Sequence, residues 1–96
     1  MLCHLTTADA WERALREGEY APESLLTDGF VHLSDPAQVE DTVKRFFAGR
    51  TDVILLSIDE KRLTAPVRRE DLYGHGEFPH LYGPLNLDAV TSAEPL

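Results

Sequence analysis

Three short stretches of the sequence carry histidines among apolar residues, and these histidines are the side chains best suited to chemistry. His4 lies in an opening apolar run, His32 lies in Phe30–Ser34, and His80 lies in Glu77–Pro84. Histidine can donate, accept or transfer a proton near neutral pH. The three stretches therefore predict a polar site that binds a ligand or moves protons. His75 is left out of this prediction because glycines flank it in a loop.

Two of the histidines have a polar residue two positions later along the chain. Ser34 follows His32, and Tyr82 follows His80. Successive side chains of a strand point to opposite faces, so each pair shares a face if its stretch is a strand. Two interpretations of the second pair stay open. Either both side chains line a pocket, or Tyr82 packs while His80 satisfies a buried carbonyl group.

The residue types allow three kinds of site: a metal site, a cysteine–histidine nucleophile pair, or a cleft for an organic ligand. The spacing of the residues along the chain decides among them. Three histidines can bind zinc, but no two of them have the short spacing typical of ligand pairs on helices or loops, so we predict no metal site. Cys3 and His4 are adjacent, and adjacent strand residues point to opposite faces, which excludes a cysteine–histidine nucleophile pair. We therefore favour a cleft between strands that binds an organic ligand.

Two amphipathic helices are expected to support these strands, at about residues 7–17 and 36–48. Thr6 is the expected N-cap of the first helix, and Ser34 or Asp35 that of the second. An apolar residue recurs every three or four positions in both segments, which predicts one buried face for each helix.

The remaining apolar segments predict strands. The nearly continuous apolar run Val53–Ile58 predicts a central strand. The stretch Val67–Leu72 is expected as a short or edge strand whose charged residues, Glu70 among them, are solvated. Strands interspersed with only two helices favour an α+β fold with two small, mainly antiparallel sheets, and they do not support a doubly wound parallel sheet.

Length, charge and cysteine content narrow the class of protein. The chain has 96 residues, which predicts a single domain spanning 1–96. Its net charge of −8 argues against an extended nucleic-acid surface. One cysteine cannot form an internal disulfide, so a reducing, cytoplasmic location is expected. No apolar stretch approaches the ~20 residues that span a bilayer, and the first residues do not form a signal peptide.

Two blocks of the sequence resemble the signature of a small, mostly bacterial family, catalogued as domain-of-unknown-function family 952. The blocks are Gly29–Ser34 and Phe78–Gly83, together with His4 in the opening strand. The likeness extends over nearly the whole chain, since further features match in order: the helix bearing Trp11, the step from Gly18 to Tyr20, and the strand Val53–Ile58.

This family is similar in fold to the ADP-ribosyltransferases, which bind NAD in a cleft between two small sheets. The resemblance implies that His4 and Ser34 help to bind the cofactor. It also implies that His32, His80 and Tyr82 take part in catalysis. In many members of that fold a late strand carries a catalytic glutamate.

No glutamate stands at the corresponding position here. Glu77 lies three residues before His80, in a different strand phase. The carboxylate that would stabilise an oxocarbenium ion is therefore missing from the motif. We expect a domain that binds NAD or a related nucleotide and transfers or hydrolyses an ADP-ribosyl or glycosyl group. The alternative, from another class, is a non-catalytic module that has kept the cleft and binds another metabolite or a protein partner.

Overall fold

The computed structural model covers residues 1–96, and its strands form three small antiparallel sheets. The first sheet has β4 (Val53–Ile58) between β1 (Leu2–Thr7) and β8 (Val90–Pro95). The second sheet pairs β2 (Glu19–Tyr20) with β7 (Leu85–Asn86). The third sheet has β6 (Phe78–Leu81) between β3 (Val31–His32) and β5 (Val67–Glu70). The α+β prediction and the central position of Val53–Ile58 are confirmed.

The number of sheets was predicted wrongly. Two sheets were expected, and the third arises because Tyr20 pairs with Leu85 in strands of two residues each. Such short strands leave no alternating pattern in the sequence. The strand expected over Phe30–Ser34 is likewise shorter, because only Val31 and His32 form regular ladder pairs.

Three α-helices and three 3-10 turns connect the strands. The helices are α1 (Ala8–Glu17), α2 (Ser24–Thr27) and α3 (Val39–Phe46). The turns cover Pro36–Gln38, Glu60–Arg62 and Leu87–Ala89. The two expected helices correspond to α1 and to the turn at Pro36 continued by α3. None of the helices has the length and apolar character needed to span a bilayer.

The helix starts agree only in part with the sequence. Thr7, not Thr6, caps α1, because its hydroxyl accepts a hydrogen bond from the Ala10 N–H at 3.2 Å. Thr6 is still in β1, where its side chain is buried and contacts the Tyr20 hydroxyl. Asp35 caps the second helical segment, and its own N–H donates to the Gln38 side chain at 2.9 Å.

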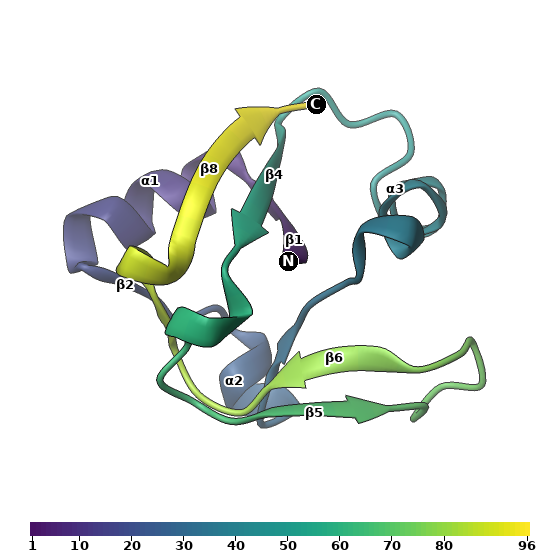
Figure 1. Ribbon diagram of the computed structural model, residues 1–96. Coiled ribbons are helices and arrows are strands. Elements are labelled where there is room, and N and C mark those ends of the chain that lie inside the picture. The colour runs from purple at the N-terminus through teal and green to yellow at the C-terminus, as the bar shows by residue number, and fades with distance from the viewer.

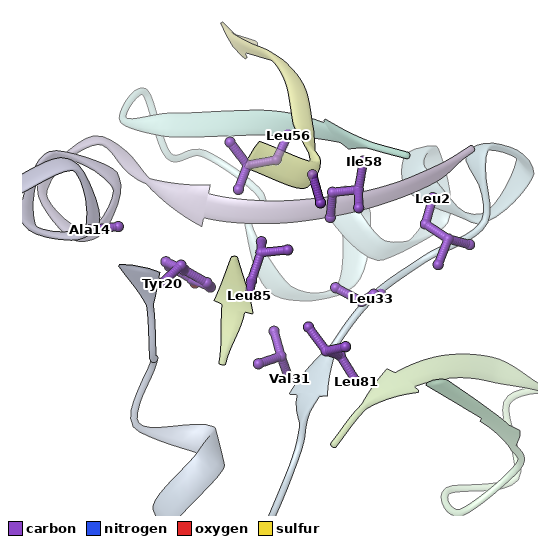
Figure 2. Close-up of a cluster of buried hydrophobic side chains, with 10 residues drawn as sticks. Leu2, Ala14, Tyr20, Val31, Leu33, Leu56, Ile58, Leu81 and Leu85 are labelled. Carbon is purple, nitrogen blue, oxygen red and sulfur yellow. The ribbon is translucent and has the colours of Figure 1, made fainter. Parts of the chain in front are cut away.

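The hydrophobic core lies where the three sheets and α1 meet. Figure 2 shows its side chains converging from elements far apart in the sequence. The core comprises ten buried residues: Leu2, Ala14, Tyr20, Val31, Leu33, Leu56, Ile58, Leu81, Leu85 and Ala89. Burial of apolar surface from every sheet in one cluster is the main stabilising contribution available to a chain of this size.

One face of the third sheet packs on the core, and its other face borders the site described below. His32 pairs with His80, and His80 pairs with Arg68 on the other side, so these side chains share one face. Val31 and Leu81 are opposite each other on the buried face and are fully inaccessible. The strand phases predicted from the apolar residues are therefore correct.

A backbone bridge holds the first sheet against the third. The Cys3 N–H donates to the Ser34 carbonyl, and the Ser34 N–H donates to the Cys3 carbonyl, both at 2.8 Å. This contact places β1 beside the end of β3, so His4 lies near His32 although the two are 28 positions apart in the sequence. Figure 1 shows that α3 and the far end of the β5–β6 hairpin lie on the same side of the molecule.

Candidate functional site

A cavity of about 550 Å³ lies against the polar face of the third sheet. Its walls come from this sheet, from the loop that joins β5 to β6, and from the last turns of α3. Its volume is in the range typical of small-molecule sites. His4, His32, Ser34 and His80 line it, so the predicted convergence of these side chains occurs. His75, which was excluded from the sequence prediction, lines it too because the β5–β6 loop folds against the opening.

The buried His80 pairs with the partly buried Glu70 at this cavity. The exposed fraction of the His80 side chain is 2%, and its Nδ1 lies 2.9 Å from Glu70 Oε1. A carboxylate accepts hydrogen bonds, so Nδ1 carries the proton and donates it. Phe30 stacks on the imidazole at 4.0 Å between ring centroids and limits its rotation. The partner of His80 is thus a carboxylate, not the carbonyl group considered above.

Tyr82 donates to the same carboxylate oxygen of Glu70, at 2.5 Å. The hydrogen bonds from Tyr82 and His80 lower the pKa of Glu70, so the carboxylate is ionised at neutral pH. The bond to Glu70 in turn raises the pKa of Tyr82, which therefore stays a neutral donor. Tyr82 itself lines a second, smaller pocket of about 370 Å³, and its ring lies 5.0 Å from the Arg68 guanidinium. It acts on the main cavity through Glu70.

The second ring nitrogen of His80 is open to the cavity. No side-chain or backbone group bonds Nε2, although every buried side-chain nitrogen and oxygen has a hydrogen-bond partner. Nε2 therefore keeps solvent access, and the cavity is where His80 meets it. In the neutral form of the ring, with Nδ1–H held by Glu70, Nε2 carries a lone pair. This arrangement can accept a proton or a hydrogen bond from a ligand.

His32 forms a second histidine–carboxylate pair beside the first. Its Nε2 lies 2.8 Å from Asp28 Oδ2, and its side chain is 41% exposed. The His32 and His80 rings are 5.6 Å apart at 69°, and Tyr73 stacks over His32 at 6.0 Å. Two imidazoles with separate carboxylate partners thus stand side by side at the cavity.

His4 has a structural role although it lines the cavity. Its Nδ1 donates to the His32 carbonyl at 2.6 Å, and its Nε2 accepts from the Tyr20 hydroxyl at 2.8 Å. Burial lowers the pKa of His4 to about 4, so the ring is neutral at pH 7. Both nitrogens are occupied by protein groups. His4 therefore fixes the backbone at His32 and offers no free polar atom to a ligand.

Ser34 lines the cavity without forming a nucleophile pair. Its side chain makes no hydrogen bond to His80 or to any other protein group, and its backbone is held by Cys3. An activated serine would need a base within hydrogen-bond reach. Ser34 can therefore bind a ligand through its hydroxyl. No group of three or more His, Cys, Asp or Glu side chains is arranged to hold a metal ion.

The opening of the cavity is apolar and partly exposed. Phe46 at the end of α3 is 70% exposed, and Leu72 and Tyr73 in the β5–β6 loop are 53% and 57% exposed. Phe47 and Phe78 line the cavity as well. Aromatic and aliphatic side chains around a few polar groups are typical of sites for planar organic ligands.

Neither carboxylate of the site, Glu70 or Asp28, was predicted from the sequence. Glu70 was expected in solvent, which is wrong: its side chain is 25% exposed and bonds His80 and Tyr82. The motif strand lacks a glutamate, but the neighbouring strand supplies one, because β5 pairs with β6 in a register that puts Glu70 opposite Phe78. Reading the glycine-rich stretch before β6 as a hairpin loop would have placed Glu70 on the face of His80. No sequence pattern indicated that Asp28 would bond His32.

Comparisons with known proteins find one matching family model and similar solved structures. The family model described as "Protein of unknown function (DUF952)" matches residues 5–93. The X-ray structure of protein CC0527 from Caulobacter crescentus is 30% identical in sequence, covers 99% of this chain and 84% of its own, and superposes with a TM-score of 0.89. The solution NMR structure of CC0527, also 30% identical, covers 99% of this chain and 83% of its own with a TM-score of 0.85. Among curated proteins no match was found.

Proposed function

Because the chain belongs to the DUF952 family, whose description assigns no reaction, we propose its function from the site: it binds NAD or a related N-glycoside and cleaves the glycosidic bond. The group released from the heterocycle passes to water or to an acceptor hydroxyl, which makes the protein a glycohydrolase-like or ADP-ribosyltransferase-like enzyme. The proposal includes a cytoplasmic site of action, with which the single, buried Cys3 is compatible.

The observation that carries this proposal is the ionised Glu70 carboxylate bound to His80 at the cavity. Cleavage of an N-glycoside builds positive charge on the ribose, and a nearby carboxylate stabilises that charge. Glu70 Oε1 accepts from both His80 and Tyr82, while Oε2 has no partner among the protein's hydrogen bonds. Glu70 therefore supports the role for which the motif strand has no glutamate.

The proposed cleavage of the glycosidic bond needs only the substrate, water or an acceptor hydroxyl, and the side chains of the cavity. The bond between ribose C1′ and the ring nitrogen breaks, and the nitrogen keeps the electron pair and leaves as a neutral heterocycle. Oxygen of water or of an acceptor hydroxyl adds to C1′ and gives up its proton. The lone pair on His80 Nε2 accepts this proton, and Glu70 stabilises the imidazolium that results. A base so oriented contributes roughly 10²–10⁴-fold to a rate.

The other residues predicted from the sequence differ in how directly they act on the ligand. His32, held by Asp28, is the second proton donor or acceptor, and the Ser34 hydroxyl orients the ligand. Tyr82 positions Glu70 and does not contact the main cavity. His4 acts only through the His32 backbone, since its nitrogens are occupied.

The test is incubation with NAD, followed by measurement of released nicotinamide, together with calorimetry using NAD, ADP-ribose and nicotinamide. Wild-type protein should bind at least one of these at millimolar concentration or below and release nicotinamide. Glu70→Gln should lower the turnover number by about 10²–10³-fold, because it removes the charge while keeping the shape. Glu60→Gln is the matched control: this exposed glutamate lies outside the cavity, 3.5 Å from Arg69, so its turnover should be that of the wild type.

One observation favours a second candidate, a non-catalytic binding module. The apolar rim formed by Phe46, Leu72 and Tyr73 is exposed, and such a surface suits a bound ligand or partner without any reaction. In that case ligands bind, and substitutions at His32 or His80 alter their affinity, but no nicotinamide is released by the wild-type protein. Turnover that disappears in Glu70→Gln eliminates this candidate, whereas absence of binding by all three compounds eliminates the leading one.

A further inference from the structure

The cavity is nearly devoid of positive charge. The chain has nine Lys and Arg residues, and Arg45 alone among them lines the cavity. Arg45 is already paired with Asp41 at 3.0 Å. Sites that grip phosphate groups combine several arginine or lysine donors with backbone N–H groups. This cavity offers one guanidinium that is shared with a carboxylate.

The helix that borders the cavity also disfavours an anion. Residues of the last turn of α3, Arg45 and Phe46, line the opening together with Phe47, the C-cap of α3. The C-terminal end of a helix carries partial negative charge, so it repels a phosphate that approaches it. The nearest arginines of the third sheet are engaged elsewhere, because Arg69 pairs with Asp35 and Glu60 and Arg68 lies over Tyr82.

The groups that do line the cavity suit a positively charged ring. Glu70 contributes a carboxylate, and Phe46, Tyr73 and Phe78 contribute aromatic side chains. The faces of such rings attract cations, which strengthens binding by about 2- to 30-fold for each contact. The protein as a whole has a net charge of −8, which adds a long-range attraction for cations and a repulsion for phosphates.

From this charge distribution we infer the substrate class of the proposed reaction: an N-ribosylated pyridinium whose cationic ring and ribose enter the cavity, with any phosphate left outside. This inference rests on the proposed function and narrows it. A nucleoside such as nicotinamide riboside is then a sufficient ligand, and the phosphates of a mononucleotide or dinucleotide add little affinity.

Calorimetry with nicotinamide riboside and nicotinamide mononucleotide tests the inference directly, since the two differ by one phosphate. We expect their dissociation constants to agree within about threefold, or the riboside to bind more tightly, because the phosphate gains no partner. ADP-ribose, which lacks the cationic ring, should bind at least about tenfold more weakly than NAD. N-methylnicotinamide, a cation, should bind more tightly than neutral nicotinamide.

Two variants separate the contribution of the aromatic ring of Tyr73 from that of the positive charge of Arg45. Tyr73→Ala should weaken binding of the riboside by about 2- to 30-fold through loss of a cation–π contact. Arg45→Ala should leave the riboside and the mononucleotide equally bound, because neither uses this side chain.

The inference is overturned if the mononucleotide binds more than about threefold more tightly than the riboside, and loss of that advantage in Arg45→Ala would identify the group that binds the phosphate. Cleavage of NAD that disappears in Glu70→Gln would then leave the proposed function standing. If none of the compounds binds, the proposed function fails together with the inference. The two failures are therefore distinguishable.

Discussion

His4 and His80 are both almost fully buried, yet their hydrogen-bond partners give them different capacities. His4 is held between a carbonyl group and the Tyr20 hydroxyl, so both its nitrogens are satisfied by the fold. His80 is held at one nitrogen by the ionised Glu70 and keeps the other for the cavity. Burial alone therefore does not decide whether a histidine is structural or able to act on a ligand. The partners of its two nitrogens decide it.

Protonation of His4 should destabilise the protein in mild acid. Its pKa is about 4 in the folded chain against 6.5 for an unperturbed histidine, so between these values the unfolded chain binds the extra proton. The contribution of His4 is fully present above pH 6.5, declines as the pH falls, and is lost near pH 4. Its size is on the order of 3 kcal/mol, since one pKa unit corresponds to about 1.4 kcal/mol. Urea unfolding between pH 4 and 7.5 measures it.

The His4→Gln variant provides the comparison, because carboxylates also titrate in acid. The free energy of unfolding of the wild type should decrease more steeply below pH 6.5 than that of His4→Gln. Equal slopes for the wild type and His4→Gln would show that the pKa of His4 is the same in the folded and unfolded chains.

At the scale of the elements, the β5–β6 hairpin and the turn that follows it set the geometry of the site. The register of the hairpin brings Glu70 to the face of His80. Gly83 ends this segment and lies against Ala65, just before β5. A methyl group built on Gly83 would lie 2.7 Å from the Ala65 methyl. The glycine is thus required by close packing between the two ends of the hairpin.

Gly83→Ala should therefore lower the free energy of unfolding by about 1–3 kcal/mol, the usual cost of overpacking. The additional change Ala65→Gly removes the clashing methyl group and should recover part of this loss. Denaturant unfolding of the single and double variants measures both effects. Gly76→Ala serves as control: its methyl group would meet no atom within 4 Å, but its φ of 100° strains any other residue.

Ala65→Gly should not rescue the control variant Gly76→Ala, since no contact joins the two positions. If Ala65→Gly raises the free energy of unfolding of Gly76→Ala as well as that of Gly83→Ala, the gain comes from the backbone and not from removal of the predicted clash.

At the scale of the whole molecule, one core joins the three sheets and α1. The ten buried residues come from all three sheets, from Leu33 just after β3, from α1 and from the turn before β8, and Figure 2 shows them in a single cluster. The Cα radius of gyration is 12.4 Å, close to the ~12.5 Å expected for a folded domain of this length. The third sheet, which carries the site, therefore depends on the same apolar contacts as the first.

This shared core predicts one cooperative unfolding transition. Leu81→Ala, at a fully inaccessible position, should cost about 2–5 kcal/mol. The same shift of the midpoint should be seen by Trp11 fluorescence, which reports on α1, and by the NMR signals of His80 in the third sheet. Leu26→Ala, at a position that is 90% exposed, should change stability by less than about 0.5 kcal/mol. Separate transitions for the two probes would mean that the sheets unfold independently.

Local patterns determined which side chains share a face. Alternation in a strand depends only on backbone geometry, so the burial of Val31 and Leu81 and the opposite orientation of His32 and His80 could be predicted from the sequence. The same holds for the ion pair between Asp41 and Arg45, which are four residues apart in α3. Such features involve residues within a few positions of one another.

Tertiary structure decided the partners of the histidines. Tyr20 reaches His4 through the short pairing of β2 with β7, and Glu70 reaches His80 through the register of β5 with β6. Registers between separate strands depend on the packing of the whole core, which no local pattern contains. For this reason the sequence identified the histidines as the chemical residues. Only the fold distinguished His80, whose Nε2 is free at the cavity, from His4, whose nitrogens are both used to hold the chain together.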